Sequence, residues 1–183
     1  AEFVKERYSK LSFEAVGQGS EFLIWPEAAW PSFLSAELNE LPFSGFGVPM
    51  LFGAPSFTQT GPRQHFNSAF WADKNGSIAE RYDKNHLVPF GEYVPLRSLL
   101  PVEKFVPGML DFSSGKEVKP VGDPSVGDLI CFDGVFPEIA RKQARAGASW
   151  LVNLTNDGWY GVSSGPYQHR DFYVFRAIET GRW

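Results

Sequence analysis

Short, unbroken apolar runs recur along this chain, bounded by glycine, proline or charged residues. Four of these runs are candidate strands, at residues 22–25, 48–53, 129–131 and 149–155. Runs this short suit strands that are covered on both faces, whereas helices need longer segments. In the C-terminal half, helices are predicted from about Pro137 to Ala146 and from Gly165 to about Thr180. A strand–helix–strand–helix order favours parallel pairing, so the chain is predicted to be an α/β protein.

Two further runs and the N-terminal segment complete the predicted elements. Residues 66–71 and 77–82 flank Asp73-Lys-Asn-Gly76, and an Asn-Gly pair between such runs predicts a hairpin that makes the sheet mixed. Residues 1–16 are predicted to form an amphipathic helix, with Phe3, Val4, Tyr8 and Leu11 on one side. Since 183 residues with 43% hydrophobic content can bury one substantial core, residues 1–183 are expected to form a single domain.

Charge and composition argue against several classes of function. The net charge is −4, and the 17 Lys and Arg residues are scattered, so no nucleic-acid partner is predicted. One cysteine and three separated histidines offer no metal-ligand spacing, and neither a metal nor another cofactor is expected. The residues contain no run of about 18 apolar side chains and no signal-peptide pattern at the start. By themselves they are therefore expected neither to span a membrane nor to direct export.

The region from Asn85 to about Gly127 is rich in proline, glycine and aromatic residues and shows little periodicity. A long irregular stretch inside a compact domain is often a binding loop or a lid. Its apolar side chains either fold back onto the core or contact lipid or acyl chains. The side chains that would suit an acyl chain are Phe105, Val106, Met109, Leu110 and Phe112.

Three residues at or just after the ends of predicted strands suit one covalent mechanism. Cys131, the only cysteine, ends the run 129–131, where α/β enzymes present a nucleophile at the rim of the sheet. Glu27 follows the run 22–25 among apolar neighbours, and its carboxylate can accept the thiol proton. The Lys84 ammonium can face the oxygen of a tetrahedral intermediate and favour the thiolate. Each residue also has an ordinary alternative. Cys131 could be a small buried side chain, Glu27 a glutamate at a helix N-terminus, and Lys84 a solvated surface lysine.

The order Glu27, Lys84, Cys131 resembles that of the carbon–nitrogen hydrolase, or nitrilase, superfamily. The surrounding sequence is similar to its membrane-associated branch, the bacterial apolipoprotein N-acyltransferases, in segments 25–31, 82–95, 130–133 and 156–169, the last running into 176–182. The similarity extends over nearly the whole chain. It implies a nitrilase-like four-layer α-β-β-α sandwich with mixed sheets, which we expect to be truncated at both ends and to lack the family's membrane-spanning part.

The resemblance also implies an inner-membrane enzyme whose catalytic domain faces the periplasm. Such enzymes move a fatty acyl chain from a phospholipid, through a thioester on the cysteine, to the N-terminal amine of a diacylglyceryl-cysteine lipoprotein. By position, Glu27 is implied as the base, Lys84 as the oxyanion stabiliser and Cys131 as the nucleophile. Further residues implied at or near the active site are Glu92, a carboxylate, and Trp159 and Tyr160, on a loop near the substrate entrance.

The sequence departs from the family pattern directly after the cysteine. Phe132 and Asp133 stand where the family usually has Tyr and Glu, which alters the hydrogen bonds around the nucleophile. Two alternatives to the acyltransferase therefore stay open. One is a soluble amidase or nitrilase, in which water resolves the same thioester. The other is an inactive domain that only binds lipid or lipoprotein.

Overall fold

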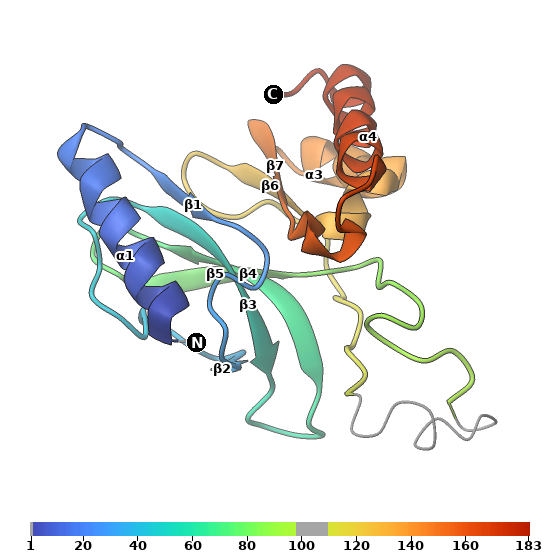
Figure 1. The fold of residues 1–183 in the computed structure, drawn as a ribbon, viewed down its shortest axis with the longest axis horizontal. Helices are drawn as coiled ribbons and strands as arrows, with labels where there is room; N and C mark the ends of the chain where they lie inside the picture. The colour runs from blue at the N-terminus through green and yellow to red at the C-terminus, as the bar shows by residue number, and fades with distance from the viewer. Residues whose placement is uncertain (1, 98–109) are drawn as a thin grey trace.

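The computed structural model describes residues 2–97 and 110–183, which form layers of helices and sheets (Figure 1). In chain order the elements, with η for a 3-10 helix, are α1 (Glu2–Gly17), β1 (Leu23–Trp25), β2 (Leu34–Ser35), β3 (Met50–Phe57), β4 (His65–Ala72), β5 (Ile78–Asp83), β6 (Val126–Ile130), η1 (Cys131–Val135), α3 (Pro137–Arg145), β7 (Trp150–Leu154), η2 (Asp157–Tyr160) and α4 (Gly165–Thr180).

The strands of the described residues lie in two sheets. The larger sheet has the order β1-β3-β4-β5, and β2 pairs with β3 beyond the end of β1. Strands β1 and β2 run parallel to β3, whereas β3, β4 and β5 are antiparallel neighbours. The smaller sheet consists of β6 and β7, which are parallel and joined through α3. The hairpin, the mixed sheet and the parallel C-terminal pairing predicted from the sequence are therefore confirmed.

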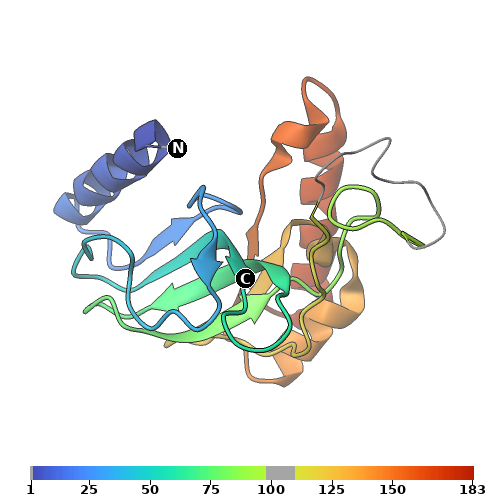
Figure 2. The same cartoon turned by 90° about the horizontal axis from the view of Figure 1, so that it is seen from below.

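The layers follow the order helix, sheet, sheet, helix. Figures 1 and 2 show α1 on one side of the larger sheet, and α3 and α4 beyond β6 and β7 on the other side. A separate group of apolar side chains fills each of the three spaces between layers. Representative pairs are Tyr8 with Trp25 under α1, Trp71 with Ile130 between the sheets, and Leu151 with Ile139 under α3.

Helix α1 packs through a face that the sequence pattern only partly predicted. Tyr8 lies on Trp25 with 5.1 Å between ring centroids, and the Trp25 indole Nε1 donates to Ser12 Oγ at 2.9 Å. The expected partners of Tyr8 on that face, namely Phe3, Val4 and Leu11, are exposed instead. The periodicity predicted the helix, but it did not show that Ser12, whose hydroxyl accepts from the buried indole, would lie on the face that contacts the sheet.

Strands β1 and β7 are less covered than predicted. Strand β1 lies at an edge of the larger sheet, and Ile24 is exposed between the buried Leu23 and Trp25. Strand β7 is half-buried up to Leu154, because β6 is its only partner among the described strands. Apolar composition indicated strands at both places, but it did not show that each would have a less covered side.

The long irregular region lies partly outside the described residues, and so do Phe105, Val106 and Met109. Its described parts, residues 85–97 and 110–125, contain no helix or extended strand, in agreement with the sequence. Leu110 is exposed, and Phe112 stacks on Phe33 with 6.4 Å between ring centroids. Of the five side chains proposed for an acyl chain, Phe112 lines the cavity described next.

Candidate active site

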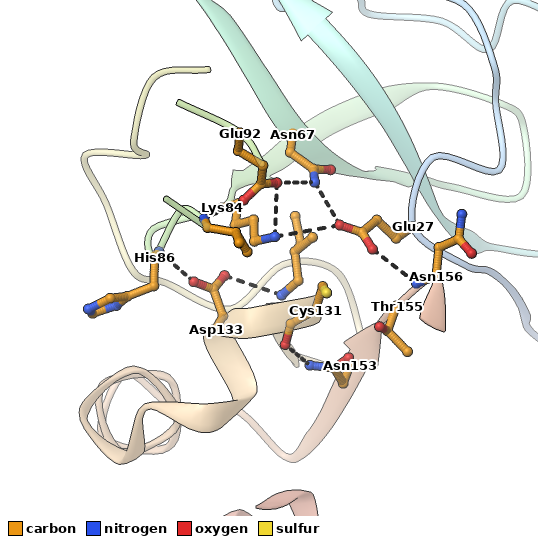
Figure 3. Close-up of polar contacts among 12 residues, drawn as sticks. Glu27, Asn67, Lys84, His86, Glu92, Cys131, Asp133, Asn153, Thr155 and Asn156 are labelled. Carbon is orange, nitrogen blue, oxygen red and sulfur yellow. Dashed lines mark hydrogen bonds and ion pairs between the residues drawn. The ribbon is translucent and has the colours of Figure 1, made fainter. Parts of the chain in front are cut away.

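The ends of three strands meet at one cavity of about 390 Å³. Glu27 comes two residues after β1, Lys84 directly after β5, and Cys131 directly after β6. All three side chains line the cavity, and the Cys131 sulfur points toward the other two (Figure 3). The structure thus brings together the three residues that the sequence singled out from distant segments.

Lys84 is buried between two carboxylates. It is 1% exposed, and its Nζ lies 2.9 Å from Oε1 of Glu92 and 3.6 Å from Oε1 of Glu27. Burial alone would lower the pKa of Lys84, but the charges of Glu92 and Glu27 outweigh it and raise the pKa above its usual value. The ammonium therefore stays protonated at neutral pH and supplies a fixed positive charge beside the cavity.

Asn67 of β4 and two backbone amides hold the two carboxylates in place. The Asn67 side-chain Nδ2 donates to Oε1 of Glu27 at 2.8 Å and to Oε1 of Glu92 at 3.0 Å. The second oxygen of Glu27 accepts from the amide of Asn156 at 2.9 Å, and that of Glu92 accepts from the amide of Val88 at 2.8 Å. Since each carboxylate has partners on both oxygens, neither rotates freely (Figure 3).

The setting of Glu27 differs from the apolar one expected from its sequence neighbours. Trp25 and Trp30 point into the core on the α1 side of the sheet, so the carboxylate contacts polar groups instead.

The turn that presents Glu27 passes very close to β3. A Cβ atom at Gly53 would lie 2.5 Å from the carbonyl oxygen of Pro26 and 2.8 Å from Cα of Glu27, which only glycine allows without displacement.

Cys131 opens η1 rather than ending the strand, which stops at Ile130. Its φ of 49° lies in the left-handed region, which non-glycine residues rarely adopt unless the surroundings impose it. Burial and the charge of Glu27 raise the pKa of the thiol to about 11, although Lys84 opposes them. Lys84 thus favours the thiolate, as predicted, but burial and the charge of Glu27 outweigh it, so the sulfur needs a base.

Asp133 lies outside the cavity and ties together the segments that follow β5 and β6. Its buried carboxylate accepts from the Tyr82 hydroxyl at 2.8 Å, the His86 amide at 2.7 Å and the Ile130 amide at 3.2 Å. Burial raises the pKa of Asp133, and these hydrogen bonds oppose that increase. The carboxylate thus links the backbone beside Lys84 to the backbone beside Cys131, across the boundary between the two sheets.

Apolar groups form the rest of the cavity wall. Trp159 is 89% exposed on η2, next to the half-exposed Tyr160, and both line the cavity. Phe132 does not line it and packs edge-on against Phe136, with 5.1 Å between ring centroids. The other apolar lining residues are Ala28, Pro55, Val88 and Phe112.

Two groups that support the site were not singled out from the sequence. Asn67 lies between Phe66 and Ser68 in a mostly apolar strand, and a polar amide at such a position is a detectable sign. Asn156 acts on Glu27 through its backbone N–H, which no residue type reveals. Among the described residues, no group of three His, Cys, Asp or Glu side chains is placed to hold a metal ion.

A family model described as carbon–nitrogen hydrolase matches residues 4–183. The chain belongs to the carbon–nitrogen hydrolase family. This membership confirms the superfamily that the order of Glu27, Lys84 and Cys131 indicated. It also agrees with the layered arrangement of the sheets and helices.

Solved structures of carbon–nitrogen hydrolases share the fold. A carbon–nitrogen hydrolase from Helicobacter pylori G27 superposes with a TM-score of 0.69 at 19% identity, over 99% of this chain and 66% of that one. An amidase from Nesterenkonia sp. gives a TM-score of 0.61 at 20% identity, over 97% of this chain and 66% of that one. These likenesses confirm the predicted α-β-β-α sandwich and, at such identities, show the fold alone.

Curated relatives with higher identity carry one name. The apolipoprotein N-acyltransferase of Geobacter metallireducens is 44% identical over 183 residues, which cover 94% of this chain and 35% of the relative. That of Rhodopseudomonas palustris is 38% identical over 199 residues, which cover 97% of this chain and 37% of the relative. The chain thus spans about a third of the length of these relatives. None of the described helices has the length and apolar character needed to cross a membrane.

Proposed function

We propose that residues 1–183 form the catalytic domain of an apolipoprotein N-acyltransferase. In this reaction Cys131 takes a fatty acyl chain from a phospholipid and passes it to the N-terminal amine of a diacylglyceryl-cysteine lipoprotein. The observation that carries the proposal is the convergence of Glu27, Lys84 and Cys131 on one cavity with an apolar wall. The name shared by the curated relatives supports it.

In the first half-reaction, Glu27 removes the proton of the Cys131 thiol as the sulfur attacks the carbonyl carbon of the phospholipid ester. A base is needed because burial and the charge of Glu27 raise the pKa of the thiol to about 11. The Lys84 ammonium donates a hydrogen bond to the oxygen that becomes negative. When the tetrahedral intermediate collapses, the C–O bond breaks and the departing alkoxide takes the proton from Glu27, leaving a thioester and a lysophospholipid.

In the second half-reaction, the neutral N-terminal amine of the lipoprotein attacks the thioester carbon. Glu27 accepts a proton from the attacking nitrogen, and Lys84 again stabilises the oxyanion. The C–S bond then breaks, the sulfur takes the proton back from Glu27, and an amide is released. Glu92 and Asn67 support both steps because they keep Lys84 charged and the Glu27 carboxylate fixed.

The apolar wall supports an acyl donor over a small polar amide. A cavity of about 390 Å³ is within the range of small-molecule sites, roughly 300–1,000 Å³. Phe112, Trp159 and Tyr160 offer apolar surface for an acyl chain, and a chain bound there would keep out the water that hydrolyses the thioester. The proposal includes a bacterial inner-membrane location, with this domain on the periplasmic side.

The test is to incubate the purified protein with phospholipid vesicles and to measure its intact mass. We expect a mass increase of one fatty acyl chain, sensitive to neutral hydroxylamine as a thioester is, and absent from Cys131→Ala. A diacylglyceryl-cysteine peptide should discharge it and yield the acylated amine. Glu27→Gln should abolish the adduct, whereas Glu21→Gln, on the exposed Glu21, should not. A protein whose thiol reacts with iodoacetamide but never with phospholipid contradicts the proposal, and hydrolysis of small amides without lipid would favour the amidase.

A further inference from the structure

The carbonyl oxygen of Cys131 lies at the centre of a second polar cluster, whose members do not line the cavity. Asn153 Nδ2 donates to this oxygen at 3.0 Å and the Tyr173 hydroxyl donates to it at 3.3 Å. His169 Nε2 lies 3.3 Å from the same oxygen. Figure 3 shows Asn153 at the carbonyl while the sulfur points the other way, so these groups restrain the backbone of the nucleophile without touching its reacting atom.

His169 connects that carbonyl to the loop that holds Glu27. It is 3% exposed on α4, and its Nδ1 lies 2.8 Å from Oδ1 of Asp157. The same carboxylate oxygen accepts from Thr155 Oγ1 at 2.8 Å. Asp157 begins η2 and directly follows Asn156, whose amide donates to Glu27. One side chain therefore bridges the nucleophile's backbone and the segment that fixes the base.

We propose that His169 is a positioning residue, which holds the Cys131 backbone in its left-handed conformation and in register with Glu27, together with Tyr173. The identity of the acyl donor rests on the proposed function, whereas the positioning does not. A φ of 49° persists only where the surroundings over-determine it, and a carbonyl surrounded by three polar groups meets that condition. Without them the peptide relaxes and the sulfur moves relative to the carbonyl carbon that it attacks.

Tyr173 is built closely into this arrangement. Burial and the neighbouring Cys131 raise the pKa of Tyr173, so its hydroxyl keeps its proton and remains a donor. Its ring lies directly on η1, because a Cβ atom at Gly134 would be only 2.1 Å from it. The hydroxyl also contacts His169 Nε2 and lies 3.0 Å from its Nδ1, so the two side chains act as one unit.

The experiment measures single-turnover acylation of Cys131 by p-nitrophenyl butyrate and, in parallel, by phospholipid vesicles. His169→Asn should lower the maximal acylation rate about 10- to 100-fold, as expected for a nucleophile displaced by up to about 1 Å. The ester concentration that gives half-maximal rate should not change, since His169 does not line the cavity. His169→Gln, whose longer amide reaches toward the Cys131 carbonyl, should restore part of the rate. Tyr173→Phe should also slow acylation, while Tyr167→Phe, on the exposed Tyr167 of the same helix, should not.

An unchanged maximal acylation rate in folded His169→Asn overturns the assignment. An equal loss of acylation rate in His169→Asn and His169→Gln also overturns it. If His169→Asn does not fold, the two tyrosine variants decide, because Tyr173→Phe removes one oxygen and keeps the ring. Equal acylation rates in Tyr173→Phe and Tyr167→Phe then overturn it. A wild-type protein that reacts with the ester but not with phospholipid refutes the proposed function, and the ester rates still test His169.

Discussion

Replacing Glu27 with glutamine is predicted to change two reactions of Cys131 in opposite directions. Burial, followed by the negative charge of Glu27, raises the pKa of the thiol from 9.0 to about 11. Removing that charge lowers the pKa and increases the thiolate fraction. The same substitution removes the proposed base that takes the thiol proton during acylation, so a more acidic thiol should belong to a less active enzyme.

The magnitude follows from the titration of the thiol. At pH 8, a thiol with a pKa of about 11 is ionised to about one part in a thousand, against about one part in ten for a pKa of 9.0. Because thiolate is the reactive form, iodoacetamide should alkylate Cys131 about 100-fold more slowly than an ordinary thiol at this pH. The rate should rise about tenfold per pH unit between pH 7 and 10. Acylation by p-nitrophenyl butyrate should fall about 100- to 10,000-fold in Glu27→Gln, the usual contribution of a general base.

Both rates can be followed by intact mass on the same preparations, with Glu21→Gln as the matched control. The expected result for Glu27→Gln is faster alkylation at pH 8 and slower acylation than in the wild type, with both rates unchanged in Glu21→Gln. A wild-type alkylation profile that levels off at or below pH 9 would refute the reasoning. Slower alkylation in Glu27→Gln would do the same, because it would mean that the carboxylate favours the thiolate.

Three further substitutions test the burial and packing around the site. Lys84→Met leaves two carboxylates buried without their cation. The free energy of unfolding, measured in urea at pH 7, should therefore fall by about 3–5 kcal/mol. Unchanged stability would contradict the buried ion pairs. Gly53→Ala should lower the free energy of unfolding by about 1–3 kcal/mol and slow the acylation of Cys131, because the added Cβ overlaps Pro26. Gly45→Ala is the control, since a Cβ there lies 4.0 Å from the nearest atom, in Leu41. Asp128 is fully buried, and burial followed by Asp133 raises its pKa well above the unfolded value. Asp128 therefore destabilises the fold least in acid, and more as the pH rises from the unfolded-state pKa toward the folded-state pKa. Asp128→Val should increase the free energy of unfolding by about 1–3 kcal/mol, and by more at pH 8 than at pH 5. A larger increase at pH 5 would contradict this reasoning.

Most of the fold could be predicted from the sequence because its strands are short apolar runs and its turns contain glycine. The hairpin of β4 and β5 and the crossover from β6 to β7 follow directly from these patterns. The three candidate catalytic residues could be found for a related reason. Each of Glu27, Lys84 and Cys131 comes within two residues of the end of a strand, and strand ends are where α/β folds place reactive groups.

The electrostatics and supporting contacts of the site could not be predicted in the same way. The acidity of Cys131 depends on burial and on nearby charges of both signs, and only the folded geometry decides the net direction. The partner of Glu27 at Asn156 is a backbone amide, and Asp133 likewise accepts from amides of distant segments. Sequence patterns describe side chains in order along the chain, whereas these contacts depend on how separate segments meet in space.

The proposed catalytic groups are divided between two sheets. Glu27 and Lys84 extend from strands of the larger sheet, and Cys131 extends from the smaller one. The proposed base and nucleophile are therefore aligned only while the sheets remain docked through the apolar cluster that includes Trp71 and Ile130. We expect acylation during refolding to return with this docking rather than with strand formation. A core substitution between the sheets, far from any substrate, would then alter turnover by changing how the two halves of the active site meet.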